Sequence, residues 1–148
     1  MTTYVLDASV AAKWFLPEGQ ETLAAEALIL LKDYVSGSVN LMVPDLFWPE
    51  LGNILWKAVR YRRISLRTAE ESLTALKGRD LATAPTFKIL EDAFAIAAAF
   101  DRTMYDAVYV ALAVVSDAPL LTADERMANA LAARFPVRWL GGYRGTSR

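Results

Sequence analysis

Thr3-Tyr4-Val5-Leu6-Asp7 is a short stretch of strand-forming residues that ends at a single acid. It is apolar and does not alternate with polar residues, which predicts a strand buried on both faces. Three later stretches are also expected to form strands: Leu41-Met42-Val43, Pro119-Leu120-Leu121-Thr122 and Val137-Arg138-Trp139-Leu140.

Segments with helical character lie between and after these strands. We expect helices over residues 8–16, 20–36, 46–62, 65–78, 86–99, 104–116 and 123–134. Asp45 and Ser65 precede two of them and are expected to act as N-caps. Short apolar strands separated by helices indicate an α/β fold, with a central parallel sheet flanked by helices in three layers. We expect one domain over residues 1–140 and a frayed tail over residues 141–148.

The composition limits the class of protein. The chain has 148 residues, of which 55% are hydrophobic, so it can bury a core and is not a disordered chain. No apolar run reaches the roughly 18 to 20 residues needed to cross a bilayer. The N-terminus has neither the basic region nor the cleavage site of a signal peptide. We therefore expect a cytoplasmic protein with no membrane partner.

The sequence contains no cysteine and no histidine. This excludes disulfides, thiolate nucleophiles, imidazole metal ligands and the Ser-His-Asp triad. An active site must therefore use carboxylates, hydroxyls, amides, Lys, Arg or Tyr. Ligation by oxygen atoms alone suits hard cations such as Mg2+ and Mn2+.

Charge is distributed unevenly along the chain. The formal net charge is −1, but residues 57–79 contain seven basic and two acidic residues, which makes this window +5 and the remainder −6. Two interpretations remain open, a solvated helix hairpin and a patch that binds a phosphate backbone. Trp48, Trp56 and Tyr61 lie in the same region and form either part of the core or a groove for a partner helix.

Two carboxylates follow predicted strands. Asp7 comes directly after the first, and Asp124 lies two residues after the strand that ends at Thr122. In open parallel sheets, ligands bind beyond the carboxyl ends of the strands. Each acid also has a purely structural interpretation, as an N-cap for Asp7 and as a favourable charge in a helix first turn for Asp124. Ser9 and Thr122 could assist a site or act only in capping.

Two further carboxylates lie on apolar helix faces. Glu50 is three residues from Phe47 and four from Ile54, so it shares their face. Asp106 precedes Tyr109 by three residues and has a capping alternative at its helix start. An ionised carboxylate buried without a partner costs several kcal/mol. If all four acids converge, their repulsion must be relieved by protonation or by a cation such as Mg2+ or Mn2+.

Four short motifs resemble those of PIN-domain nucleases, and most closely those of the VapC toxins of bacterial toxin–antitoxin pairs. They occur in the family's order and cover nearly the whole chain: Val5-Leu6-Asp7-Ala8-Ser9-Val10, Pro49-Glu50-Leu51-Gly52-Asn53, Tyr105-Asp106-Ala107-Val108-Tyr109-Val110-Ala111-Leu112-Ala113 and Leu121-Thr122-Ala123-Asp124-Glu125-Arg126. Each motif is weak alone, but the four together are specific.

The resemblance implies a PIN fold and a Mg2+- or Mn2+-dependent endoribonuclease. Asp7, Glu50, Asp106 and Asp124 match the family's four catalytic and metal-binding acids. Ser9 and Thr122 match its supporting hydroxyl positions, and none of the six departs from the pattern. The resemblance also implies an RNA substrate, a homodimer and a VapB-like antitoxin. Promoter DNA would be bound only indirectly, through that antitoxin.

Two functions other than RNA hydrolysis fit part of the pattern. A phosphoaspartate protein, such as a receiver domain or a dehalogenase-like phosphatase, also places an acid at a strand end. The phosphatase needs a second acid where this chain has Ser9, and the receiver needs paired N-terminal acids and a late lysine. The other alternative is a catalytically inactive PIN-fold interaction module. Such a module has no reason to retain carboxylates that point into the core.

Overall fold

A five-stranded parallel sheet forms the centre of the protein, which is represented by a computed structural model that describes residues 1–146. The strand order is β3-β2-β1-β4-β5, and each neighbouring pair is parallel. In β1, Val5 pairs with Met42 of β2 on one side and with Leu120 of β4 on the other. The strands are β1 (Thr2–Leu6), β2 (Val39–Pro44), β3 (Ala82–Ala84), β4 (Leu120–Thr122) and β5 (Val137–Trp139).

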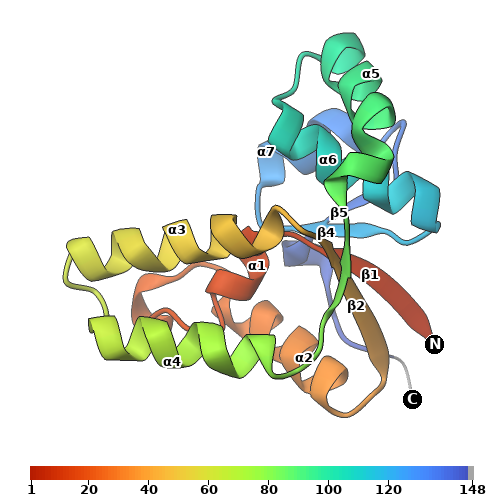
Figure 1. Ribbon diagram of the computed structural model, residues 1–148. Helices are drawn as coiled ribbons and strands as arrows, with labels where there is room; N and C mark the ends of the chain where they lie inside the picture. The colour runs from red at the N-terminus through yellow and green to blue at the C-terminus, as the bar shows by residue number, and fades with distance from the viewer. Residues whose placement is uncertain (147–148) are drawn as a thin grey trace.

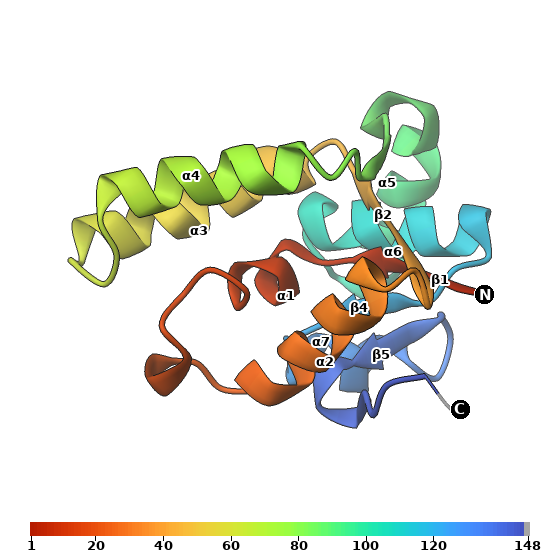
Figure 2. The same cartoon turned by 90° about the horizontal axis from the view of Figure 1, so that it is seen from below.

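Helices cover both faces of the sheet. α1 to α4 lie on one face and α5 to α7 on the other (Figure 1), which confirms the expected three-layer α/β fold. α3 and α4 form a hairpin that extends beyond the sheet (Figures 1 and 2). The helices are α1 (Ala8–Ala12), α2 (Ala24–Val35), α3 (Phe47–Arg60), α4 (Leu66–Lys77), α5 (Leu90–Phe100), α6 (Met104–Ser116) and α7 (Glu125–Leu131), with 3-10 turns η1 (Glu18–Gln20), η2 (Thr86–Ile89) and η3 (Leu140–Gly142).

The core lies between the sheet and one apolar face of each helix. Val5 and Leu6 of β1 are fully buried, as are Leu51 and Leu55 on the inner face of α3. From α6, Val110 packs into the opposite layer with no exposed surface. Within residues 1–146, no helix combines the length and the apolar character that a membrane span requires.

The edge strand β3 was not expected from the sequence. Ala82, Thr83 and Ala84 contain no large apolar residue, and two of the three are exposed. The strand exists because its backbone pairs with β2, where Met42 is opposite Ala82 and Val43 is opposite Thr83. An edge strand with one neighbour has little need for apolar side chains, so hydrophobic patterning does not reveal it.

One expected helix cap is confirmed and one is wrong. The Ser65 hydroxyl accepts a hydrogen bond from the Thr68 amide at 3.0 Å and so caps α4. Asp45 does not cap α3, which begins after Leu46 without a side-chain cap. The Asp45 carboxylate instead accepts hydrogen bonds from the amide and hydroxyl of Thr86. It therefore ties the end of β2 to the segment that follows β3.

The expectation of a frayed tail over residues 141–148 is wrong for residues 141–146, while 147 and 148 lie outside the described residues. Tyr143 is only 8% exposed, and its hydroxyl donates to Oδ2 of the buried Asp33 at 2.5 Å. The Thr146 amide donates to the same oxygen at 3.1 Å. Burial and the hydrogen bond to Asp33 raise the pKa of Tyr143, so the phenol stays protonated as the donor.

Replacing Tyr143 with Phe is expected to lower the free energy of unfolding by about 1–3 kcal/mol, because the buried Asp33 carboxylate loses a donor. Urea denaturation measures this change. Tyr105→Phe is the matched control, since that ring is 66% exposed. Equal stability of the two variants would show that the Asp33 contact does not hold the C-terminal segment.

Candidate active site

The site lies where the connections of the sheet change direction. β1 leads to β2 on one side, whereas the chain after β3 returns to pair β4 on the other side of β1. A crevice forms at such a point, beyond the carboxyl ends of the two central strands. Asp7 follows β1 directly, and Thr122 ends β4. The Asp7 amide donates to the Leu121 carbonyl at 3.1 Å and joins the two strand ends.

Asp7 has the capping role that the sequence left open, and it makes a second contact at the end of β4. Its Oδ1 accepts a hydrogen bond from the Ser9 amide at 3.3 Å, which makes Asp7 the N-cap of α1. Its Oδ2 accepts a hydrogen bond from the Thr122 hydroxyl at 2.7 Å. These two bonds fix the carboxylate at the switch point between β1 and β4.

Glu50 reaches the site from α3, in the helix layer formed by α1 to α4. The neighbouring Leu51 is fully buried and anchors this turn of the helix in the core. Glu50 itself is partly buried, and its Oε1 atom is buried without a hydrogen-bond partner among residues 1–146. An unsatisfied buried carboxylate oxygen is costly, so its position indicates a functional requirement.

Asp106 reaches the site from the other layer, in the first turn of α6. Its amide donates to the Thr103 hydroxyl at 3.1 Å, so the Thr103 side chain caps the helix and the Asp106 carboxylate does not. That carboxylate pairs with Nη2 of Arg102 at 2.9 Å. Arg102 was not anticipated as part of the site, because it lies between α5 and α6 and not on a helix face with Asp106.

Asp7, Glu50 and Asp106 act on one another electrostatically. Burial raises the pKa of Asp7, and the charge of Asp106 raises it further, against the hydrogen bonds from Thr122 and Ser9. Burial also raises the pKa of Glu50, with added contributions from the charges of Asp7 and Asp106. The sheet and both helix layers therefore bring three carboxylates into one region, where their repulsion opposes ionisation.

Tyr109 lies close to Asp7 and Glu50, although the sequence pattern indicated only a position on an apolar helix face. It is 2% exposed, and its hydroxyl accepts a hydrogen bond from the Ala8 amide at 3.4 Å. Burial, followed by the charges of Asp7 and Glu50, raises the pKa of Tyr109 far above its ordinary value. Tyr109 is therefore a neutral phenol beside the acids, and its contact with Glu50 acts to lower the pKa of that carboxyl.

Asp124 is set apart from the other three acids. Its side chain is exposed, and Oδ1 accepts a hydrogen bond from the Met127 amide at 3.1 Å, which makes it the N-cap of α7. Its amide donates to the Thr122 hydroxyl at 3.1 Å, the group that also binds Asp7. The Ser9 hydroxyl accepts from the Ala123 amide at 3.2 Å and holds the same turn. Asp124 is thus linked to Asp7 through Thr122, while its carboxylate is directed to α7.

The acids suit a hard divalent cation, but they are not arranged around a common ligand position. Within residues 1–146, no three acidic side chains form a group that could hold one ion. Asp106 is paired with Arg102, and Asp124 caps α7. The donors are nonetheless all oxygen, and Glu50 Oε1 has an unused acceptor site. A metal site built from the four acids remains a prediction, which requires side-chain rotation at Asp106 and Asp124.

The raised pKa of Glu50 predicts a pH-dependent gain in stability when the carboxylate is removed. The unfolded chain releases this proton near 4.5, whereas the folded protein retains it to higher pH, so the free energy of unfolding falls as pH rises through this range. Glu50→Gln is therefore expected to raise Tm at pH 7 in EDTA, and the gain should vanish below pH 4.5. Thermal melts from pH 4 to 8 measure it. A Tm difference independent of pH would contradict the assignment.

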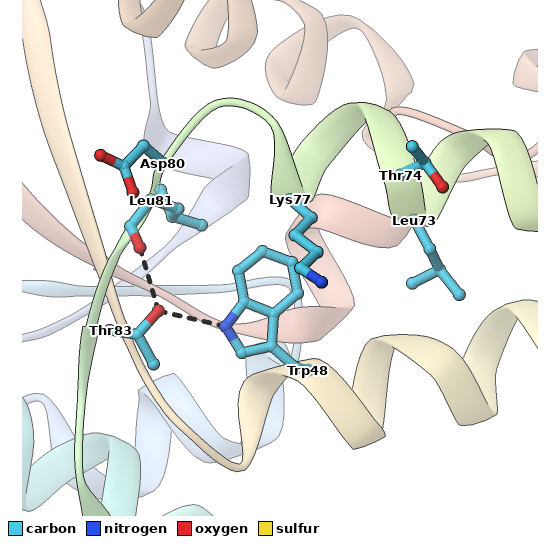
Figure 3. Close-up of a pocket in the computed structure, with 7 residues that line it drawn as sticks. All are labelled: Trp48, Leu73, Thr74, Lys77, Asp80, Leu81 and Thr83. Carbon is cyan, nitrogen blue, oxygen red and sulfur yellow. Dashed lines mark hydrogen bonds between the residues drawn. The ribbon is translucent and has the colours of Figure 1, made fainter.

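A pocket of about 610 Å3 lies between α3, α4 and β3, away from the acids (Figure 3). Trp48 lines it, and its indole Nε1 donates to the Thr83 hydroxyl at 3.1 Å. Leu73 and Lys77 line it from α4. Trp48 is partly buried, whereas Trp56 is 51% exposed farther along α3.

The basic window over residues 57–79 is divided between several environments. Arg63 pairs with Glu21 at 2.7 Å, and Arg67 pairs with Glu71 within exposed α4. Arg79 lies over the Tyr34 ring, 5.3 Å from its centre. The window is therefore neither wholly solvated nor one continuous basic patch.

The comparisons with known proteins agree with this fold. The chain is 36% identical to Ribonuclease VapC3 of Pyrobaculum aerophilum over 142 residues, which covers 90% of this chain and 95% of that protein. It is 32% identical to Ribonuclease VapC1 of Mycobacterium tuberculosis over 131 residues, with 88% and 92% covered.

Solved structures show the same architecture at lower identity. The crystal structure of PAE2754 from Pyrobaculum aerophilum matches with a TM-score of 0.65 at 21% identity, covering 95% of this chain and 90% of that one. A toxin-antitoxin complex from Klebsiella pneumoniae matches with a TM-score of 0.64 at 16% identity, covering 91% and 95%. The family model for the PIN domain matches residues 4–131. The chain therefore belongs to the PIN domain family.

Proposed function

We propose that this protein is a Mg2+- or Mn2+-dependent endoribonuclease that acts as a VapC-type toxin. Two observations support the proposal: the charges of Asp7 and Asp106 raise the pKa of Glu50, although the three acids come from the sheet and both helix layers, and the buried Glu50 Oε1 has no hydrogen-bond partner among residues 1–146. The two relatives above 30% identity are both named Ribonuclease VapC, which supports the same activity. A cytoplasmic location is part of the same proposal.

In the proposed reaction, Asp7, Glu50, Asp106 and Asp124 would hold the metal. A bound divalent ion would supply charge stabilisation at the phosphate and activation of water. Thr122 orients Asp7 through its 2.7 Å hydrogen bond and, with Ser9, keeps the Asp124 turn in place. Tyr109 excludes water from the inner side of the cluster as a buried neutral phenol.

Attack of water in line with the departing 3′ oxygen leaves a 5′-phosphate and does not use the RNA 2′-hydroxyl. The test is incubation of purified protein with single-stranded RNA in Mn2+, Mg2+ or EDTA, followed by end-group analysis. The expected result is metal-dependent cleavage with 5′-phosphate ends. Products with 2′,3′-cyclic phosphates, or equal cleavage in EDTA, would contradict the mechanism. If neither Mn2+ nor Mg2+ supports cleavage, the result would favour the inactive interaction module.

A VapB-like antitoxin is the proposed partner. One structural neighbour is a toxin–antitoxin complex, and the pocket lined by Trp48, Leu73 and Leu81 offers apolar surface that suits an amphipathic segment, with Lys77 and Asp80 as charged groups beside it. Promoter DNA would be bound only through that partner. Co-expression with the adjacent gene and purification of a complex tests this proposal, and isolation of the protein alone would contradict it.

A homodimer is part of the same proposal. Phe94 of α5 and Tyr105 of α6 are 65% and 66% exposed, and Val115 adds a further exposed apolar side chain on α6. Large exposed apolar side chains on two packed helices are the kind of surface that a second copy could cover. Light scattering after gel filtration is expected to give twice the 16.3 kDa chain mass. A monomer mass at micromolar concentration would contradict it.

A further inference from the structure

A separate pocket of about 350 Å3 opens beside the acids. It is lined by Ser9 and Asp124 of the candidate site and by three more charged residues, Lys13, Glu21 and Arg63. Lys13 follows α1, Glu21 follows η1, and Arg63 lies between α3 and α4. Three separate segments therefore place charged side chains next to the candidate catalytic centre.

Lys13 and Arg63 share one carboxylate. Lys13 Nζ is 3.3 Å from Oε1 of Glu21, and Arg63 Nη2 is 2.7 Å from Oε2. The Arg63 Nε also donates to the side-chain oxygen of Gln20 at 2.7 Å. The side chain of Lys13 is only 8% exposed and that of Glu21 15%. Lys13 and Glu21 are thus largely buried, while the Arg63 side chain is 31% exposed at the edge of the group.

Lys13, Glu21 and Arg63 together carry a formal charge of +1, which Asp124 offsets from the same pocket lining. The two cations share the one carboxylate of Glu21, so neither cation has a carboxylate of its own. An anion that enters the pocket would supply a further acceptor to both.

Phosphate matches the remaining hydrogen-bonding groups. A lysine ammonium has three donors and a guanidinium has five, and the contacts with Glu21 and Gln20 occupy only part of them. Charged donors of this kind bind phosphate oxygens strongly. RNA carries one phosphate per nucleotide, so a strand whose reacting phosphate lies at Asp7 brings neighbouring phosphates to the surrounding surface.

We propose that the Lys13–Glu21–Arg63 pocket binds a backbone phosphate of the RNA strand next to the phosphate that is cleaved. Lys13 and Arg63 bind the phosphate oxygens, and Glu21 positions both cations. This inference rests on the proposed RNA hydrolysis. It assigns a substrate-binding role to residues that lie outside the four acidic motifs.

Binding measured without cleavage tests the pocket. A fluorescent single-stranded RNA with a 5′-hydroxyl is titrated with protein in EDTA at several salt concentrations. The Lys13→Gln, Arg63→Gln double variant is expected to raise Kd about tenfold or more. It should also reduce the slope of log K against log salt by about 0.7, the value for one phosphate contact on a single strand.

Arg67→Gln is the matched control, because Arg67 also pairs with a glutamate but is 88% exposed on α4. It should leave Kd and slope near those of the unmodified protein. Lys13→Arg keeps the charge and should retain the slope. Glu21→Gln raises the formal charge of the pocket from 0 to +1 and should tighten binding, whereas a role limited to structure would lower only Tm.

The two proposals fail in different ways. An unchanged slope in the double variant, with circular dichroism showing a folded protein, would overturn the phosphate pocket even if the enzyme cleaves RNA. A reduced slope in a protein that cleaves no RNA with Mn2+ would retain the pocket and overturn the proposed hydrolysis. If the slope of the double variant is unchanged, tighter RNA binding by Glu21→Gln would not rescue the pocket.

Discussion

Asp7→Asn is expected to lower the rate of RNA cleavage by about 10²- to 10³-fold or more, comparable to the loss of a principal electrostatic group in other active sites. Asp7 stands at the end of β1, where the charge of Asp106 raises its pKa and its own charge raises the pKa of Glu50. Asparagine keeps one oxygen that can accept from the Ser9 amide, and its side-chain nitrogen can donate to the Thr122 hydroxyl, so the local structure should persist. Initial rates in Mn2+ with single-stranded RNA provide the measurement.

The matched control for this variant is Asp117→Asn. Asp117 is exposed at the end of α6, and its φ of +49° is one that asparagine tolerates. Cleavage by the control should equal that of the unmodified protein. Because burial raises the pKa of Asp7, removal of its charge should not lower Tm in EDTA. A folded Asp7→Asn variant with full activity would contradict the assignment.

Phe47→Ala is expected to lower the free energy of unfolding by about 3–5 kcal/mol. Phe47 opens α3 and has no exposed surface, and its ring packs edge to face against Trp48 at 5.1 Å between centres. The loss is a large part of the roughly 5–15 kcal/mol that stabilises a domain. It would also release the turn of α3 that carries Glu50, so RNA cleavage should fall as well.

Urea denaturation followed by circular dichroism measures this loss. Tyr61→Ala is the control on the same helix, because Tyr61 lies at the other end of α3 and is 77% exposed. It should change stability by less than about 1 kcal/mol. A loss of the same small size in Phe47→Ala would show that the start of α3 is not packed in the core.

The sequence predicted the parts of the fold that depend on local pattern. Four of the five strands and the main helices follow from apolar runs and helical periodicity. The strand-end position of Asp7 and the inward faces of Glu50 and Asp106 follow from the same patterns. β3 did not, because Ala82–Ala84 becomes a strand only through backbone pairing with β2. Tyr143 was missed because its burial depends on Asp33, far away in sequence.

Side-chain partners in the site were the least predictable feature. The Arg102–Asp106 pair was missed because Arg102 lies in the connection before α6, where helical spacing does not apply. Tyr109 lies one helical turn from Asp106, but its apolar ring made a core role the natural interpretation. The pairing of Lys13 and Arg63 through Glu21 depends on three segments that meet only in the folded chain. No local pattern reports such a contact.

Direct titration of Mn2+ into the RNA-free protein, followed by electron paramagnetic resonance, is the sharpest test of the acidic site. Free and bound Mn2+ are distinguished without any reference to cleavage. The unmodified protein and Asp117→Asn should bind Mn2+ with the same affinity. Asp7→Asn, Glu50→Gln and Asp106→Asn should each weaken binding about tenfold or more, since each removes a charged oxygen ligand. Equal Mn2+ affinity in all five proteins would contradict a metal site formed by these acids.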